Sequence, residues 1–316
     1  MESPPDGSSD SPVAVTAAPS TADAQASGRS LGDVLWDYLI LAKPEISSVV
    51  TLSAFAGFLI GSPGGLDGGT LLWTMLGTAL CAGGVGTLNH VLERQYDAQM
   101  KRTAQRPLPA GRADPDMARR VGILLICLAV GLLCPLVNVL TAVLAALTAV
   151  LYLFVYTPLK RTTKWNTLVG TVPGALPALG GYTAATGHLE AGGWATFGIL
   201  ATWQMPHFLS LAWMYRKDYA RGDYAMLPVV EPDGNSTAAQ MIGFAALLVP
   251  LSVLPVLTET AGWIYGVGVV PLGLWFLWTT IVFHGERTGQ KARRVLKASV
   301  FYIPALVALL LVDWFL

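Results

Sequence analysis

Charged residues are scarce in this sequence. Only 13% of its 316 residues are Asp, Glu, Lys or Arg, against about 25% in a typical soluble domain. The formal net charge is zero, which argues against a nucleic-acid partner. The three cysteines are odd in number, lack metal-site spacing and lie within apolar runs, so we interpret them as small packing residues.

Apolar sequence is abundant, with 53% hydrophobic residues. A membrane-spanning helix needs about 20 mostly apolar residues. We therefore predict an all-α fold, a polytopic membrane bundle of about nine helices in a single domain over residues 31–316. The predicted spans are 35–61, 70–92, 119–135, 138–157, 166–186, 192–214, 238–257, 262–283 and 296–316.

The basic residues alternate along the predicted connections. All 20 Lys and Arg flank the first span or lie near the connections that follow spans two, four, six and eight. The other connections hold only the acidic residues Asp67, Glu190 and Glu259. The positive-inside rule then predicts a cytoplasmic N-terminus and an outside C-terminus, in a cell membrane.

The first 30 residues are rich in Ser, Pro, Ala and Asp and contain no apolar run. We predict that residues 1–30 form a disordered cytoplasmic tail. Because an apolar segment is missing, this tail does not resemble a signal peptide.

Three polar residues at the end of the second span form the first candidate site. Asn89, Glu93 and Asp97 are spaced by four, so a helix places them on one face. Two carboxylates and an amide suit Mg²⁺, which also takes oxygens from a bound phosphate. A solvated helix end is the alternative. Several basic residues that could offset the charge of a diphosphate lie near the same end of the second span. They are Arg94, Lys101, Arg102 and Arg106.

The connection after span four reads YTPLKRTTKWN. Tyr156 fits an interfacial anchor as well as a substrate contact. We expect Pro158 to end the helix. Lys160 and Arg161 then lie at the cytoplasmic face, where they serve either as topology signals alone or in a functional role as well.

Span five begins at Asn166 and contains Pro173 and Pro177. Prolines at these positions predict a kinked or broken helix, either as a purely structural feature or because it lines a cavity. In span six, Gln204 and His207 lie within an apolar run. Buried polar groups of this kind usually face a bundle interior or a ligand.

His207 therefore has two interpretations. It could contact an acceptor substrate, or it could bond a carbonyl freed by the adjacent Pro206. Farther on, Lys217 and Asp218 reach the cytoplasmic face. We expect Asp218 to supply a third carboxylate to a metal site with Glu93 and Asp97.

These segments resemble the UbiA superfamily of membrane prenyltransferases, and most closely its protohaem IX farnesyltransferase (haem O synthase) branch. The resemblance runs from about Lys43 to Val230. Two departures stand out: Glu93 and Gln95 stand where the branch often has Asp, and Asp223 comes one residue later than the second motif, D-x-x-x-D, requires. The matching segments are N-x-x-x-[DE]-x-x-x-D at 89–97, M-x-R-T-x-x-R-P at 100–107, YTPLKR at 156–161, PGALP at 173–177, WQ-x-PHF at 203–208, KDY at 217–219 and MLPVV at 226–230.

The resemblance implies transfer of farnesyl from farnesyl diphosphate to haem B, which is a substrate rather than a cofactor, giving haem O. It implies Mg²⁺ held through Asn89, Glu93, Asp97 and Asp218. It also implies the lipid bilayer, and a haem A synthase or oxidase assembly proteins, as partners. The residues expected to bind substrate, some of them by stabilising the leaving diphosphate, are Arg94, Lys101, Arg102, Arg106, Tyr156, Lys160, Arg161, Asn166, Gln204, His207 and Lys217.

Three alternatives remain from the sequence. An aromatic acceptor such as a quinone precursor would use the same metal site. Broken helices and buried polar residues also suit a transporter, although paired inverted halves are not evident. A haem-binding scaffold would explain His207 but not Asn89, Glu93 and Asp97.

Overall fold

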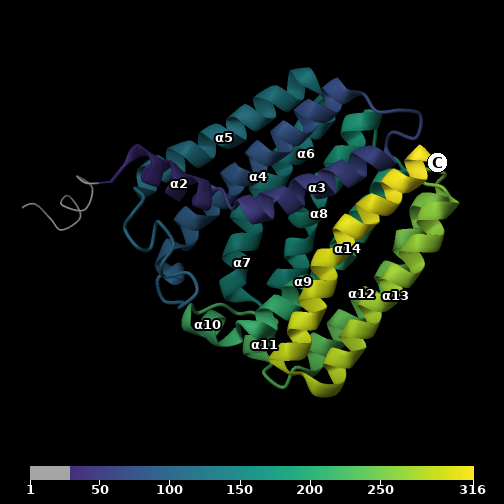
Figure 1. Ribbon diagram of the computed structural model, residues 1–316. Coiled ribbons are helices and arrows are strands. Elements are labelled where there is room, and N and C mark those ends of the chain that lie inside the picture. Colours follow the sequence, from purple (N-terminus) through teal and green to yellow (C-terminus); the bar gives the residue numbers. More distant parts are fainter. Residues whose placement is uncertain (1–28) are drawn as a thin grey trace, which may run out of the picture.

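The computed structural model describes residues 29–316, so the predicted tail lies outside the described residues except for Arg29 and Ser30. Within residues 29–316 the chain contains helices, turns and loops, and no strand. The predicted all-α fold is confirmed. Figure 1 shows the long helices side by side in one bundle.

Every predicted span corresponds to one helix or to two or three consecutive helices. Short helices at the polar end are α10 (Arg216–Arg221) and α11 (Leu227–Val230). The long elements are α2 (Leu31–Leu41) with α3 (Pro44–Ile60), α4 (Gly68–Asp97), α5 (Pro115–Leu136), α6 (Val139–Val150) with η1 (Leu151–Tyr156) and α7 (Thr157–Thr162), α8 (Asn166–Thr186), α9 (Ala191–Met214), α12 (Asn235–Leu257), α13 (Trp263–Glu286) and α14 (Gly289–Phe315).

Six helices of the described chain are long and apolar enough to cross a membrane, and the bent pair α2–α3 makes a seventh. Helices α8 and α9, of 21 and 24 residues, are also long enough, since 20 residues of α-helix span about 30 Å. More than half of their residues are buried. They face protein rather than lipid, so Gly, Thr and Gln can replace apolar residues in them. A bundle of about nine spans is compatible with these helices.

The first span is bent rather than continuous. Helices α2 and α3 meet at 50°, and Lys43 between them adopts a left-handed conformation with φ of 50°. Pro44 at the start of α3 explains the break, because a residue before proline is disfavoured in the right-handed helical region. The bend directs Lys43 toward α4, where its side chain bonds Asn89.

Pro158 does not end its helix, so that prediction is wrong. The chain passes from α6 through one π-helical turn, η1, into α7. The amide of Thr157 bonds the carbonyl of Tyr152, and its hydroxyl donates to the same oxygen at 2.8 Å. The wider turn tolerates a proline in the next position and carries Lys160 on into α7. Helix α8 likewise runs unbroken through Pro173 and Pro177.

Glycines allow the bundle to pack closely around α8. A Cβ on Gly181 would lie 1.8 Å from the carbonyl oxygen of Ala54, and one on Gly57 would lie 1.9 Å from that of Ala178. Backbones of α3 and α8 therefore touch directly, as small residues permit in membrane proteins. This contact fixes α3, and with it Lys43, against the centre of the bundle.

The connections rich in Lys and Arg gather at one end of the bundle. The loop after α4, together with α7, α10 and α11, lies at the end away from the C-terminus (Figure 1). The segregation of polar connections inferred from charge is therefore present in the fold.

Candidate active site

The three predicted polar residues of α4 share one face and are buried. Asn89, Glu93 and Asp97 are 1%, 7% and 1% exposed. A charged side chain is seldom buried unless it is paired. Each of the three has partners from other segments, so they form one connected cleft.

Asn89 joins three elements. Its Oδ1 accepts a hydrogen bond of 2.6 Å from Nζ of Lys43, and its Nδ2 donates to Oγ1 of Thr157 at 3.2 Å. Sequence reasoning assigned Lys43 to topology only and missed this contact. The Lys-Pro pair at the start of an apolar run was the available signal, because proline restricts the residue before it.

Glu93 is paired with Lys160. The carboxylate Oε1 lies 2.8 Å from Nζ of Lys160, and the two side chains are only 9% and 13% exposed. The ammonium also lies 4.7 Å from the ring centre of Tyr156 and 5.9 Å from that of Tyr152. A cation held over aromatic faces beside a carboxylate keeps its charge in a dry site.

Asp97 is paired with Arg106. Its Oδ2 lies 2.8 Å from Nη1 of Arg106, and its backbone carbonyl accepts a bond from the hydroxyl of Thr103. Nδ1 of His90 lies 3.8 Å from the same carboxylate, too far for a hydrogen bond. The loop after α4 thus folds back so that Arg106 covers the acid at the helix end.

An outer layer of Arg and Tyr surrounds this cleft. Arg161 bonds the hydroxyl of Tyr96 and lies 3.3 Å from Asp223. Arg102 stacks over Tyr215, with its guanidinium carbon 4.4 Å from the ring centre, and bonds the hydroxyl of Tyr219 at 3.3 Å. The predicted Arg102 and Arg161 therefore tie the loops of the polar end together.

Asp218 pairs with Arg221 at 2.7 Å. Within residues 29–316, no three His, Cys, Asp or Glu side chains lie close enough together to hold a metal ion. The structure therefore does not assemble Glu93, Asp97 and Asp218 as a ready-made site. Their role as a metal set stays a prediction.

Three predicted basic residues lie at the edge of the polar end. Lys101 and Lys217 are exposed, and Arg94 is half-buried. These three side chains make no hydrogen bond or ion pair in the described part of the chain. They are free to meet an anion, and their assignment to the diphosphate stays a prediction.

Asn166 and its surroundings fasten the start of α8. The amide of Asn166 donates to the carbonyls of Thr163 and Ala225 at 2.6 and 2.9 Å. Lys164 pairs with Glu231, and this bond lowers the pKa of Glu231 below its ordinary value. These contacts hold the residues on either side of α11 against the start of α8, which gives Asn166 a structural role.

Gln204 and His207 of α9 are both held by hydrogen bonds. The Nε2 of Gln204 donates to the carbonyl of Leu200 at 3.0 Å. Its Oε1 lies so close to Gly174 that a Cβ there would be 1.9 Å away. His207 bonds Ser299 of α14 through Nδ1 at 2.8 Å.

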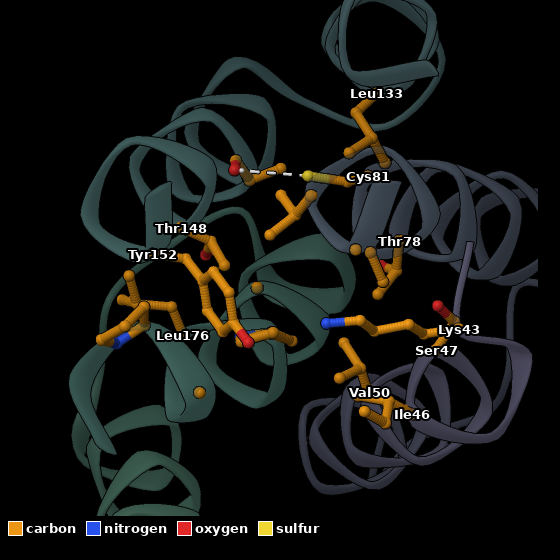
Figure 2. A pocket seen from close by; sticks show the side chains of 18 of the residues that line it. Lys43, Ile46, Ser47, Val50, Thr78, Cys81, Leu133, Thr148, Tyr152 and Leu176 are labelled. Carbon is orange, nitrogen blue, oxygen red and sulfur yellow. Dashed lines mark hydrogen bonds between the residues drawn. The ribbon is translucent and has the colours of Figure 1, made fainter. Parts of the chain in front are cut away.

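An apolar cavity begins at Lys43. It has an empty volume of about 780 Å³ and lies between α3, α4, α5, α6, η1 and α8. Figure 2 shows the Lys43 ammonium reaching in from one side and Tyr152 facing it. Leu133 and Thr141 also line the cavity. Because Thr141 and Tyr152 are eleven residues apart on continuous helix, the cavity extends over about 16 Å.

A second hollow lies on the other side of the cleft. It has an empty volume of about 640 Å³ and is lined by residues of α4, η1 and α7, with Glu93, Tyr96 and Arg161 among them. Leu92 and Phe154 at its edge are exposed, so it opens sideways toward lipid. Tyr224 also lines it, and the hydroxyl of this residue is buried without a partner in residues 29–316.

The sequence pattern of the UbiA prenyltransferase family matches residues 50–305. The chain belongs to this family. A protoheme IX farnesyltransferase from Salinibacter ruber is 96% identical over 283 residues, covering 90% of this chain and 100% of the relative. One from Solibacter usitatus is 43% identical, covering 88% of this chain and 98% of the relative.

Solved structures share the fold at low identity. A digeranylgeranylglyceryl phosphate synthase matches with a TM-score of 0.73 and 17% identity, covering 89% of this chain and 99% of that one. A UbiA homologue from Archaeoglobus fulgidus bound to DMAPP and Mg²⁺ matches with a TM-score of 0.63 and 18% identity, covering 87% and 99%. This prenyltransferase is thus an all-helical, multi-pass membrane protein.

Proposed function

We propose that this prenyltransferase transfers the farnesyl group of farnesyl diphosphate to a vinyl group of haem B. The product is haem O, which carries a hydroxyethylfarnesyl side chain. The relatives named protoheme IX farnesyltransferase support this choice of donor and acceptor. The observation that carries the proposal is the apolar cavity that begins at Lys43, beside Asn89 and the Glu93–Lys160 pair.

The cavity suits an isoprenoid chain whose charged end stays in the polar cleft. Farnesyl has 15 carbons, and burial of each CH₂-sized group contributes about 0.8 kcal/mol. The upper limit is roughly 12 kcal/mol before ordering costs are subtracted. The diphosphate would then meet Lys43 at the cavity mouth.

The cleft holds the charges that a diphosphate needs. Lys160 pairs with Glu93 and Arg106 pairs with Asp97, while Lys43 donates to the amide oxygen of Asn89 on the same face of α4. When the donor binds, Lys160 and Arg106 exchange a carboxylate for phosphate oxygens, and they stabilise charge on the leaving group. The two carboxylates and Asn89 are then released for another partner.

That partner is Mg²⁺ in this proposal. Asn89, Glu93 and Asp97 offer hard oxygen donors on one face, and Mg²⁺ needs only one or two carboxylates when phosphate oxygens complete its shell. Asp218 would join after leaving Arg221. Bound Mg²⁺ would supply electrophilic stabilisation of the diphosphate.

The chemistry breaks the bond between farnesyl carbon 1 and the diphosphate oxygen. The vinyl group of haem B forms the new carbon–carbon bond, and water adds to the resulting cation as a proton leaves. The aromatic rings of Tyr152 and Tyr156 lie by the Lys160 side of the cleft, where they exclude stray water. We place the cleft at the cytoplasmic face of a cell membrane, because the basic connections lie at that end.

Membranes that contain this chain test the proposal directly. They are incubated with labelled farnesyl diphosphate, Mg²⁺ and either haem B or 4-hydroxybenzoate, and the products are analysed by mass spectrometry. Haem O formed only when the chain and Mg²⁺ are present supports the proposal. Prenylated hydroxybenzoate without haem O would identify an aromatic acceptor instead.

A further inference from the structure

His207 has one nitrogen fixed and one free. Its Nδ1 lies 2.8 Å from Oγ of Ser299, and that hydroxyl also lies 2.7 Å from the carbonyl of Leu296. A carbonyl can only accept, and a serine hydroxyl has one hydrogen. Both contacts are satisfied together only if Ser299 donates to Leu296 and His207 donates from Nδ1. The Nε2 atom then carries an unshared lone pair.

This lone pair is accessible. Within residues 29–316, no group bonds Nε2 of His207, and Nε2 is not among the fully enclosed unpaired atoms. The imidazole contacts two neighbouring aromatic rings. It stacks on Trp203 at 5.1 Å with planes 23° apart, and it meets the edge of Phe208. Trp203 is itself bonded to the Ser299 carbonyl at 2.9 Å.

His207 belongs to a stretch of α9 that is surrounded by other helices of the bundle. From Ala195 to Met214 no residue of α9 is exposed. Half-buried residues on this stretch gather on the helix face that contains Gln204, whose side chain meets Gly174 in the cavity wall. Five residues beyond His207 along α9, Ala212 packs against Met100 and Tyr224 of the polar end. Along α9, His207 thus lies between Gln204, which meets the cavity wall, and Ala212, which packs against the polar end.

We propose that Nε2 of His207 ligates the iron of the acceptor porphyrin and so positions its vinyl group for prenylation. A neutral imidazole with its other nitrogen hydrogen-bonded is the usual form of a metal-bound histidine. Ligation adds a bond to iron without changing its oxidation state. The inference rests on the proposed function, because that function supplies haem B as the acceptor.

Haem spectroscopy tests the inference without turnover. Haem B is titrated into the purified full chain in detergent without prenyl donor, and optical and resonance Raman spectra report histidine ligation. The critical variant is His207→Asn, whose amide can still donate to Ser299 but cannot replace Nε2. We expect it to lose the histidine-ligated spectrum and to bind haem B at least roughly tenfold more weakly, while its affinity for metal-free protoporphyrin stays unchanged.

The chain offers matched controls, because it has only four histidines. His188→Ala and His284→Ala alter exposed residues and should leave the spectrum unchanged. In Ser299→Ala the Nδ1 hydrogen bond is removed, so the ferrous iron–histidine stretching band should shift. This second variant keeps the inference testable if His207→Asn fails to fold.

Each outcome of these experiments either supports or overturns the inference about His207. A wild-type chain that binds haem B without a histidine ligand, or a His207→Asn variant that keeps the ligand, overturns the inference. Either result can coexist with haem O production, in which case the proposed function stands. If membranes with the chain make no haem O at all, the proposed function fails, and a His207-dependent spectrum would then support haem binding alone.

Discussion

Nζ of Lys160 lies 2.8 Å from Oε1 of Glu93 and joins two helices through residues 67 positions apart. Both side chains are largely buried, at 13% and 9% exposed. Removing one partner from such a pair leaves an uncompensated charge in a dry site, which is more costly than losing both. The pair therefore couples the stability of the bundle to the chemistry of the cleft.

Lys160→Met should reduce the free energy of unfolding by about 3–5 kcal/mol and abolish farnesyl transfer. The double variant Glu93→Gln/Lys160→Met should regain most of the stability and none of the activity. Thermal unfolding in detergent and product analysis measure the two effects. Lys164→Met is the control, because its pair with Glu231 is more exposed and contributes little. A Lys160→Met variant as stable as the wild type would contradict this account.

Lys43→Met should weaken binding of farnesyl diphosphate, measured without acceptor. A hydrogen bond to a charged group contributes about 1.5–3 kcal/mol, which corresponds to an affinity loss of about tenfold to a hundredfold. The Lys43→Arg variant, which keeps the positive charge, should lose less affinity for farnesyl diphosphate. Lys297→Met, which alters an exposed basic residue of α14, should bind the donor normally. Equal affinities in Lys43→Met and the wild type would remove Lys43 from the donor site.

Hydropathy and charge predicted much of this fold because both act locally. Span boundaries follow from apolar run length, and the polar end follows from Lys and Arg placement. The i, i+4, i+8 spacing likewise placed Asn89, Glu93 and Asp97 on one face. The partners of these residues are long-range: Lys43 reaches Asn89 only because α3 begins at a bend.

The wrong prediction for Pro158 and the untested one for Asp218 can also be understood in physical terms. The helix continues through Pro158 because the π-turn η1 absorbs the missing amide, and hydropathy does not encode that turn. Residue spacing could not place Asp218 relative to α4, since tertiary folding decides which loops meet. Asp223 pairs with Arg161. This pairing agrees with the position of Asp223, which is one residue later than the second motif requires.

Gly181→Ala should destabilise the bundle. The added Cβ would lie 1.8 Å from the carbonyl oxygen of Ala54, so α3 and α8 would have to separate. Overpacking of this kind costs about 1–3 kcal/mol. Gly243→Ala on α12 is the control, because a Cβ there meets nothing within 4 Å. The unfolding temperatures of the two variants are compared with that of the wild type in the same detergent. If Gly181→Ala unfolds at the wild-type temperature, α3 and α8 can shift freely, which would contradict this prediction.

Gly180→Leu should shorten the cavity and change the preferred donor. Gly180 is buried and lines the cavity, and an added Cβ meets nothing within 4 Å, so the new side chain would enter the space reserved for the isoprenoid tail. The last five carbons of farnesyl contribute up to about 4 kcal/mol of burial. We expect kcat/KM for farnesyl diphosphate to fall at least roughly tenfold relative to geranyl diphosphate. Gly243→Leu places the same side chain at an exposed position and should keep the wild-type preference. If Gly180→Leu keeps that preference too, the isoprenoid chain lies outside this cavity.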